Sequence, residues 1–220
     1  MISKTKLYTA ISTLIFLMTF TAVQAQMSIG LKAGSTGIGG EFTKSITEKL
    51  NARVSGSFFS YSQDGVYADD DPSIAYDVQG DMTSIGLLVD YFPTKRWLKV
   101  SAGVYYHDFI VDGGAVPNES YTLDDKTFQP EKLGSLTGTV DYDSKIVPYA
   151  GIGLGNPLAP GSRVKVNFEI GAMYTNSPNV TMEGEGMIAP TANQDQDFEN
   201  GLSDFQFYPV INLGVSFRIQ

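Results

Sequence analysis

The last segment of the chain alternates regularly between apolar and polar positions. Every odd-numbered residue from Phe205 to Ile219 is apolar, whereas most of the even-numbered residues between them are small or polar. Side chains of a strand point to opposite faces with a period of two, so the pattern predicts a strand with one apolar face and one wet face. A tilted strand crosses a bilayer with about 9–11 residues. We therefore interpret this segment as the closing strand of a transmembrane β-barrel.

The same alternation recurs in seven earlier segments, which makes eight predicted strands. They span residues 27–34, 38–43, 50–58, 84–91, 98–107, 145–154, 163–174 and 205–220. The connections at 47–49, 93–96 and 156–162 are short and the one at 35–36 is tight, whereas 63–74, 112–136 and 177–204 are long, polar and acidic. Outer-membrane barrels have short periplasmic turns and longer external loops. The pattern predicts an all-β fold, an eight-stranded antiparallel up-and-down transmembrane β-barrel with both termini in the periplasm.

The N-terminus has the features of a secretory signal peptide. Lys4 and Lys6 precede a short apolar stretch at 11–20, and small residues at 23–25 suggest cleavage before Gln26. We expect a signal peptide at 1–25 and one outer-membrane barrel domain at 26–220. Export followed by insertion predicts a location in the bacterial outer membrane, with the barrel-assembly machinery as a partner during insertion.

The composition of the chain argues against several partners and kinds of chemistry. Removing residues 1–25 takes away two of the 15 basic residues and no acidic one, so 13 basic and 24 acidic residues remain, a net charge of −11. This acidity argues against a nucleic-acid partner. The chain has no cysteine, which excludes disulfides, thiolate metal sites and a cysteine nucleophile.

The predicted register turns a set of charged side chains towards the lumen. An eight-stranded barrel is only wide enough for side chains to fill, and an unpaired charge away from water is costly. We therefore expect a plugged interior held by paired charges. A narrow, gated channel or small-solute transporter is the alternative for the same side chains. The predicted lumen network consists of Lys32, Glu41, Arg53, Asp90, Lys99, Lys145, Arg163, Lys165, Glu169 and Arg218.

Three strand segments resemble those of small bacterial outer-membrane β-barrel proteins: 28–34 (SIGLKAG), 148–156 (PYAGIGLGN) and 208–218 (YPVINLGVSFR). The resemblance covers essentially the whole mature chain and is closest to the OmpA/OmpW-like group of eight-stranded barrels. Its motifs are structural, so it implies a fold and a location more than an activity. Such proteins usually end on an aromatic residue that the assembly machinery reads, whereas here Phe217 is followed by three further residues. We expect no wall-anchoring role, because no peptidoglycan-binding domain follows the predicted barrel.

Catalytic and metal-binding alternatives have weaker support. A lipid-modifying enzyme would need a general base with a nucleophile within hydrogen-bond reach, and His107, the single histidine, is the candidate base. Ser101 lies on the same face of the strand as His107 but about 20 Å from it along the strand. No Gly-x-Ser-x-Gly elbow is present. The acidic stretches do not match an EF-hand, so no cofactor or metal is predicted. These stretches are Asp69–Asp71 and the set Glu183, Glu185, Asp195, Asp197 and Glu199.

A soluble lipid carrier of eight strands would need an apolar interior, whereas the charged set here faces inward. The sequence therefore favours a non-enzymatic outer-membrane protein with a structural or surface-interaction role. We expect it to be a monomer that contacts outer-membrane lipids and lipopolysaccharide, with external loops facing the medium.

Overall fold

The computed structural model describes residues 26–68, 73–94, 97–123, 126–187, 189, 201–202 and 205–219. The predicted signal peptide, 1–25, lies outside the described residues. Among the described residues, no helix is long and apolar enough to cross a membrane.

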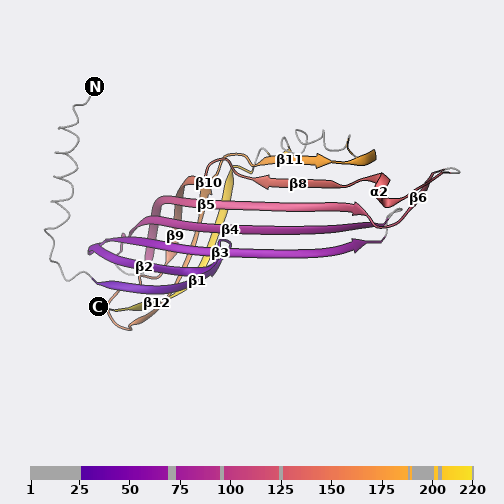
Figure 1. Ribbon diagram of the computed structural model, residues 1–220. Helices are drawn as coiled ribbons and strands as arrows, with labels where there is room; N and C mark the ends of the chain where they lie inside the picture. The colour runs from indigo at the N-terminus through magenta and orange to yellow at the C-terminus, as the bar shows by residue number, and fades with distance from the viewer. Residues whose placement is uncertain are drawn as a thin grey trace, which may run out of the picture.

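Eight antiparallel strands close into a ring, which confirms the ring predicted from the sequence (Figure 1). Around the ring, each strand pairs with the next in the order β1-β2-β3-β4-β5-β9-β10-β12, and β12 pairs with β1. The strands are β1 (Met27–Gly34), β2 (Gly37–Thr47), β3 (Leu50–Tyr67), β4 (Ile74–Tyr91), β5 (Leu98–Pro117), β9 (Ile146–Leu154), β10 (Val164–Tyr174) and β12 (Phe207–Arg218).

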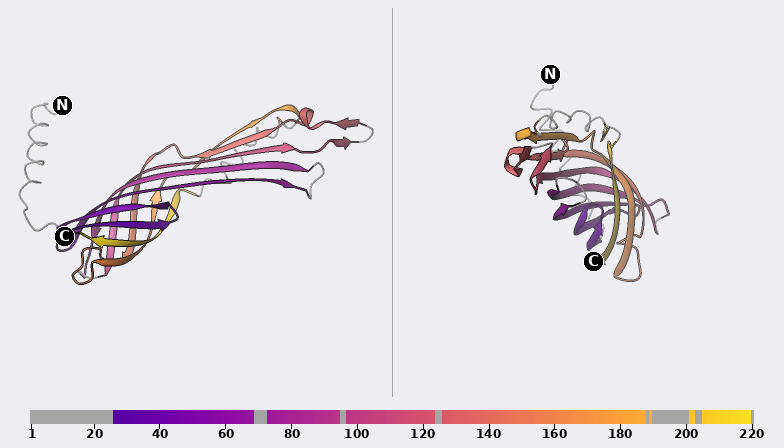
Figure 2. Two further views of the ribbon diagram at one scale, coloured as in Figure 1. Left: turned by 60° about the horizontal axis from the view of Figure 1, so that its bottom comes forward. Right: turned by 90° about the vertical axis from the view of Figure 1, so that its right-hand side faces the viewer.

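Three of these strands continue well beyond the ring and form an open sheet, which we call the extension (Figures 1 and 2). It comprises residues 59–67 of β3, 74–82 of β4 and 109–117 of β5, to which β8 (Leu136–Asp141) and β11 (Asn179–Gly184) add in that order. The connection from β5 to β8 contains β6 (Tyr121–Leu123), β7 (Lys126–Phe128) and the short helix α2 (Pro130–Leu133). The end of the barrel that carries the extension is called the extension end, and the other the short-turn end.

The extension corrects the sequence prediction. Residues 63–74, 112–136 and 177–204 were expected to be long loops, yet much of their described part is strand. The physical reason is that the alternation of apolar residues continues past the ring but changes phase.

The phase change occurs at one level on three neighbouring strands. On β3, the outward apolar positions are even-numbered up to Phe58, and the apolar positions become odd-numbered from Phe59 onward. Phe59, Met82 and Phe109 lie opposite one another, so the change falls at the same register row on β3, β4 and β5. Below this row, the outer face is apolar, as lipid contact requires. Above it, most of the outer face is polar and acidic, as expected for water, with an apolar row of Val66, Ala75 and Val116 only near the tip.

Candidate functional site

Arg53 lies at the centre of the lumen. It points inward from β3, and its guanidinium contacts three carboxylates. Nη2 lies 2.7 Å from Glu169 Oε2 and 2.9 Å from Asp90 Oδ1, and Nη1 lies 3.3 Å from Glu41 Oε2. All four side chains are at most 4% exposed. Charge-assisted hydrogen bonds of this kind are the strongest available to a buried guanidinium.

The contact between Arg53 and Glu169 crosses the lumen. Arg53 is on β3 and Glu169 is on β10, and these strands are four positions apart around the eight-stranded ring in either direction. Strands so related stand on opposite walls. Because the two side chains meet at 2.7 Å, they bridge the lumen from one wall to the other at this level.

Neighbouring side chains add further hydrogen bonds to the carboxylates. Lys99 on β5 forms an ion pair with Glu169, and the Ser101 hydroxyl donates to Asp90 at 2.6 Å. Glu41 accepts from the Asn167 amide at 2.8 Å and from the Ser216 hydroxyl at 3.0 Å. Buried charges persist when they are paired and hydrogen-bonded. Every charge of this group is paired, although among the described residues Arg53 Nε and Asp90 Oδ2 have no hydrogen-bond partner.

Lys32 balances the charge of the group without a direct ion pair. Its side chain is buried on β1, and among the described residues its Nζ has no hydrogen-bond partner. The ammonium lies 5.8 Å from the centre of the Tyr105 ring, within the range of a cation–π interaction. Three buried cations therefore face three buried anions. We call this set the lumen network: Lys32, Glu41, Arg53, Asp90, Lys99 and Glu169.

An apolar cluster packs against the lumen network and fills more of the lumen. Its members are Leu88, Tyr105, Val147, Tyr149, Met173 and Val210. The Tyr149 hydroxyl donates to Glu169 at 2.7 Å, and the rings of Tyr105 and Tyr149 meet edge to face. Leu88 is an apolar residue at an inward-facing position of β4, and its place in this apolar cluster accounts for it.

His107 lies at the extension end of the lumen and is fully buried. Its Nδ1 lies 2.8 Å from the hydroxyl of Ser84, and its ring packs on Tyr208. Sequence reasoning considered Ser101 and missed Ser84, which is the direct cross-strand neighbour of His107. No acid orients the ring, because Nε2 has no partner among the described side chains. A nucleophile–base pair needs an orienting group and access for substrate, so we interpret the Ser84–His107 hydrogen bond as structural.

Four cations of the predicted network lie elsewhere. Lys145, Arg163, Lys165 and Arg218 are exposed or half-buried, because each is near a strand end where its long side chain reaches water or loop carbonyls. Lys165 donates to the carbonyl of Pro160, and Arg218 donates to the carbonyls of Ala159 and Gly161.

Lys145 turns to Asp108 at the extension end instead of pointing into the lumen. Its Nζ lies 3.1 Å from Asp108 Oδ1. A hydrogen bond to Asp108 and attraction by its charge raise the pKa of Lys145 above its usual value.

The stretches considered for calcium are only partly described. Residues 69–71, 195, 197 and 199 lie outside the described residues. Among those that the structure describes, no group of three or more histidine, aspartate, glutamate or cysteine residues could hold a metal ion.

No family model matches the chain, and no curated protein matches it. Solved structures share its fold. Acinetobacter baumannii CarO2 has a TM-score of 0.61 at 21% identity, covering 88% of this chain and 98% of that one. A. baumannii CarO has a TM-score of 0.59 at 22% identity, with coverages of 86% and 96%. A major outer membrane protein from Thermus thermophilus has a TM-score of 0.51 at 17% identity, with coverages of 89% and 99%.

At these identities the similarity establishes the fold alone: the chain folds like the barrels of these proteins. The narrower resemblance to the OmpA/OmpW-like group stays a prediction.

Proposed function

We propose that this chain is an outer-membrane β-barrel protein with a closed lumen, which acts at the surface through its extension and neither conducts nor catalyses. The observation that carries the proposal is the contact between Arg53 and Glu169 across the full width of the ring. An eight-stranded barrel has little interior beyond its side chains. Here the lumen network and the apolar cluster occupy it together.

The location is supported by the outer surface of the ring. Large apolar side chains face outward on all its strands, among them Leu31, Ile38, Leu87, Ile152 and Leu213. Such a surface needs lipid around it. The Thermus protein of the same fold is itself named as an outer membrane protein. By the rule of short periplasmic turns, both termini lie in the periplasm and the extension points outward. We expect a monomer in contact with outer-membrane lipids and lipopolysaccharide.

An interaction role is supported by the extension. A protein whose only role was to span the membrane would need no sheet beyond the ring. Yet about half of the length of each of β3, β4 and β5 lies beyond the ring. The extension offers an acidic outer face and an inner face with exposed aromatic residues such as Tyr61 and Tyr67.

Solute flux through proteoliposomes tests the closed lumen. The folded mature protein is reconstituted into liposomes, and swelling in an isotonic solution of a small sugar is compared with protein-free liposomes and with a known general porin. Insertion is verified by gel mobility with and without heating. The proposal expects swelling no faster than in protein-free liposomes. Swelling that rises with the amount of inserted protein would contradict it and favour a small-solute transporter.

A further inference from the structure

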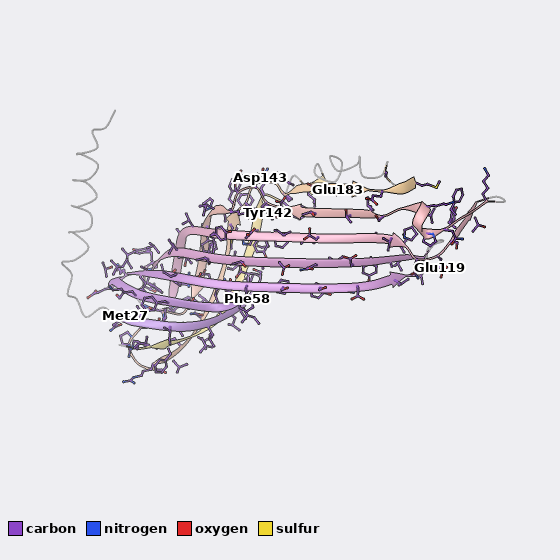
Figure 3. The ribbon with its side chains drawn as sticks, viewed as in Figure 1. Met27, Phe58, Glu119, Tyr142, Asp143 and Glu183 are labelled. Atoms are coloured by element: carbon purple, nitrogen blue, oxygen red, sulfur yellow. The ribbon has the colours of Figure 1, made fainter. Side chains whose placement is uncertain are left out.

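β3 loses one of its two neighbours when it leaves the ring. Phe58 is the last residue of β3 in register with β2, opposite Ile38. From Phe59 to Tyr67, β3 still pairs with β4 on one side, residue for residue. Among the described residues, no strand pairs with its other side. Figure 3 shows this course from the labelled Phe58, beside the start of β2, towards the tip of the extension near Glu119.

The direction of the backbone groups on this free edge follows from two contacts. The carbonyl of Lys49 accepts a hydrogen bond from the amide of Phe92, so it faces β4. The carbonyl of Phe58 faces the β2 side, where it packs against Gly37. Backbone groups of successive residues point to opposite sides of a strand. The backbone groups of even-numbered residues therefore point away from β4. The free edge presents the N–H and C=O groups of Ser60, Ser62, Asp64 and Val66.

This edge has few of the features that normally prevent strand addition, and its one charged residue is Asp64. Natural edges are short, carry lysine or proline, or are interrupted by a bulge. Residues 59–67 contain no lysine, arginine or proline, and the pairing with β4 runs without a register shift from Leu50 to Tyr67. The opposite edge of the extension, β11, is only six residues long. The long edge of β3 is therefore the better template for a further strand.

The two faces beside the edge differ in chemistry and define what an added strand would carry. On the outer face, Asp64 lies directly opposite Asp77, and Asp81 lies four residues further along β4, opposite Ser60. Hydrogen bonds from Ser60 and Gln79 lower the pKa of Asp81, which keeps it ionised. Like charges placed opposite each other repel, so a cation beside Asp64 would stabilise this face. On the inner face, Phe59, Tyr61 and Tyr67 are about half exposed.

We propose that residues 59–67 of β3 bind an extended segment of another protein by strand addition, with basic side chains on the acidic face and apolar side chains on the aromatic face. This inference rests on the proposed surface-interaction role and names its partner class. A second copy fits the edge less well. If two copies in one membrane are related by a two-fold axis along the membrane normal, their β3 strands are parallel. The acidic face of one copy then lies beside the aromatic face of the other, so the two faces do not match.

The probe is a fluorescent nine-residue peptide that alternates valine and lysine, titrated against the full mature protein folded in lipid nanodiscs and followed by anisotropy. Three variants separate the contribution of backbone pairing from that of charge attraction. Ser62→Pro removes an edge N–H and blocks the approach of a strand, and proline is tolerated where the N–H faces solvent. Ser62→Ala is the matched control, and Asp64→Asn removes the charge. Unchanged gel mobility before heating shows that each variant is folded.

We expect binding to the unmodified protein and to Ser62→Ala, at least about tenfold weaker binding to Ser62→Pro, and weaker, less salt-dependent binding to Asp64→Asn. A peptide N-methylated at every residue keeps its charge but has no N–H with which to form the ladder on either edge, and it should not bind. Equal binding of both peptides, or equal binding to Ser62→Pro and Ser62→Ala, would overturn strand addition in favour of charge attraction alone.

Dimers that Ser62→Pro abolishes would instead identify a second copy as the occupant and would also overturn the proposal. The liposome assay is independent of all these outcomes, so failure of strand addition and failure of the closed lumen are distinguishable.

Discussion

Replacing Arg53 by methionine tests whether the lumen network stabilises the fold. Methionine keeps most of the side-chain length but removes the guanidinium, so Glu41 and Asp90 lose their only ion pair among the described residues, whereas Glu169 keeps Lys99. Removing one partner of a buried ion pair typically costs about 3–5 kcal/mol, because an uncompensated charge remains. With three carboxylates affected, we expect a loss at the upper part of that range.

Unfolding by urea in lipid vesicles measures the effect. Trp97 is the single tryptophan of the chain and lies at the short-turn end, about half exposed, so its fluorescence reports on unfolding. Lys145→Met is the matched control, since it also removes one cation, but from a pair that is 50% and 29% exposed. Exposed pairs contribute only about 0–1 kcal/mol.

A double variant gives the sharper comparison. Arg53→Met combined with Asp90→Asn leaves two cations, Lys32 and Lys99, facing two anions, and the asparagine oxygen still accepts from Ser101. We expect the double variant to be more stable than Arg53→Met alone. Equal stabilities of Arg53→Met and Lys145→Met would refute the reasoning, since they would show that the buried charges are not held by their pairing.

Three further predictions concern topology, packing and chemistry. In intact cells, an impermeant maleimide should label Asp64→Cys and leave Lys49→Cys unlabelled, because the parent chain has no cysteine and these residues lie at opposite ends of the barrel; the reverse result would invert the proposed orientation. Gly103→Val should lower the midpoint of urea unfolding well below that of the parent chain, because a Cβ there would lie 2.1 Å from the carbonyl oxygen of Leu87. An unchanged midpoint would mean that β4 and β5 separate easily. His107→Ala should leave the lipid A and phospholipid profile of expressing cells unchanged, since the Ser84–His107 pair is buried without an orienting acid; loss of a modified lipid would revive the enzyme hypothesis.

The ring could be predicted from the sequence because each of its strands has one lipid face and one lumen face. Alternation with a period of two, as from Phe205 to Ile219, identifies both the strand and its orientation. The inward direction of Arg53 and Glu169 followed from the same pattern. Their partnership across the ring did not, because period-two alternation gives the face of a side chain but not its depth on a tilted strand.

The extension was missed for a different reason. Phe59, Tyr61 and Tyr67 on β3 and the even-numbered positions from Ile74 to Met82 on β4 keep a period of two with the opposite phase, so these residues fall on the face that is wet inside the ring. The adjacent pair Phe58 and Phe59 marks this change and is the signal that could have revealed it. β8 and β11 were hidden because each is only six residues long and holds only two large apolar residues, too few to show an alternation.

The four cations that lie outside the lumen network show that strand register alone does not predict where a long side chain ends. Lys145 is opposite His107 in the ladder, which predicts an inward side chain. Its long, flexible chain instead reaches the carboxylate of Asp108 at the water-exposed end. Burying an ammonium costs free energy that a neighbouring exposed carboxylate makes unnecessary.

Single-channel recording tests the central claim, a lumen closed by side chains that meet across the ring, most directly. The mature protein is refolded, inserted into a planar bilayer and recorded at rising salt concentrations, with insertion verified by protease protection of the same preparation. The account predicts a silent bilayer at every salt concentration, because Arg53 and Glu169 close the lumen from opposite walls. Discrete openings whose conductance rises with salt would contradict it and would make the lumen charges the lining of a channel.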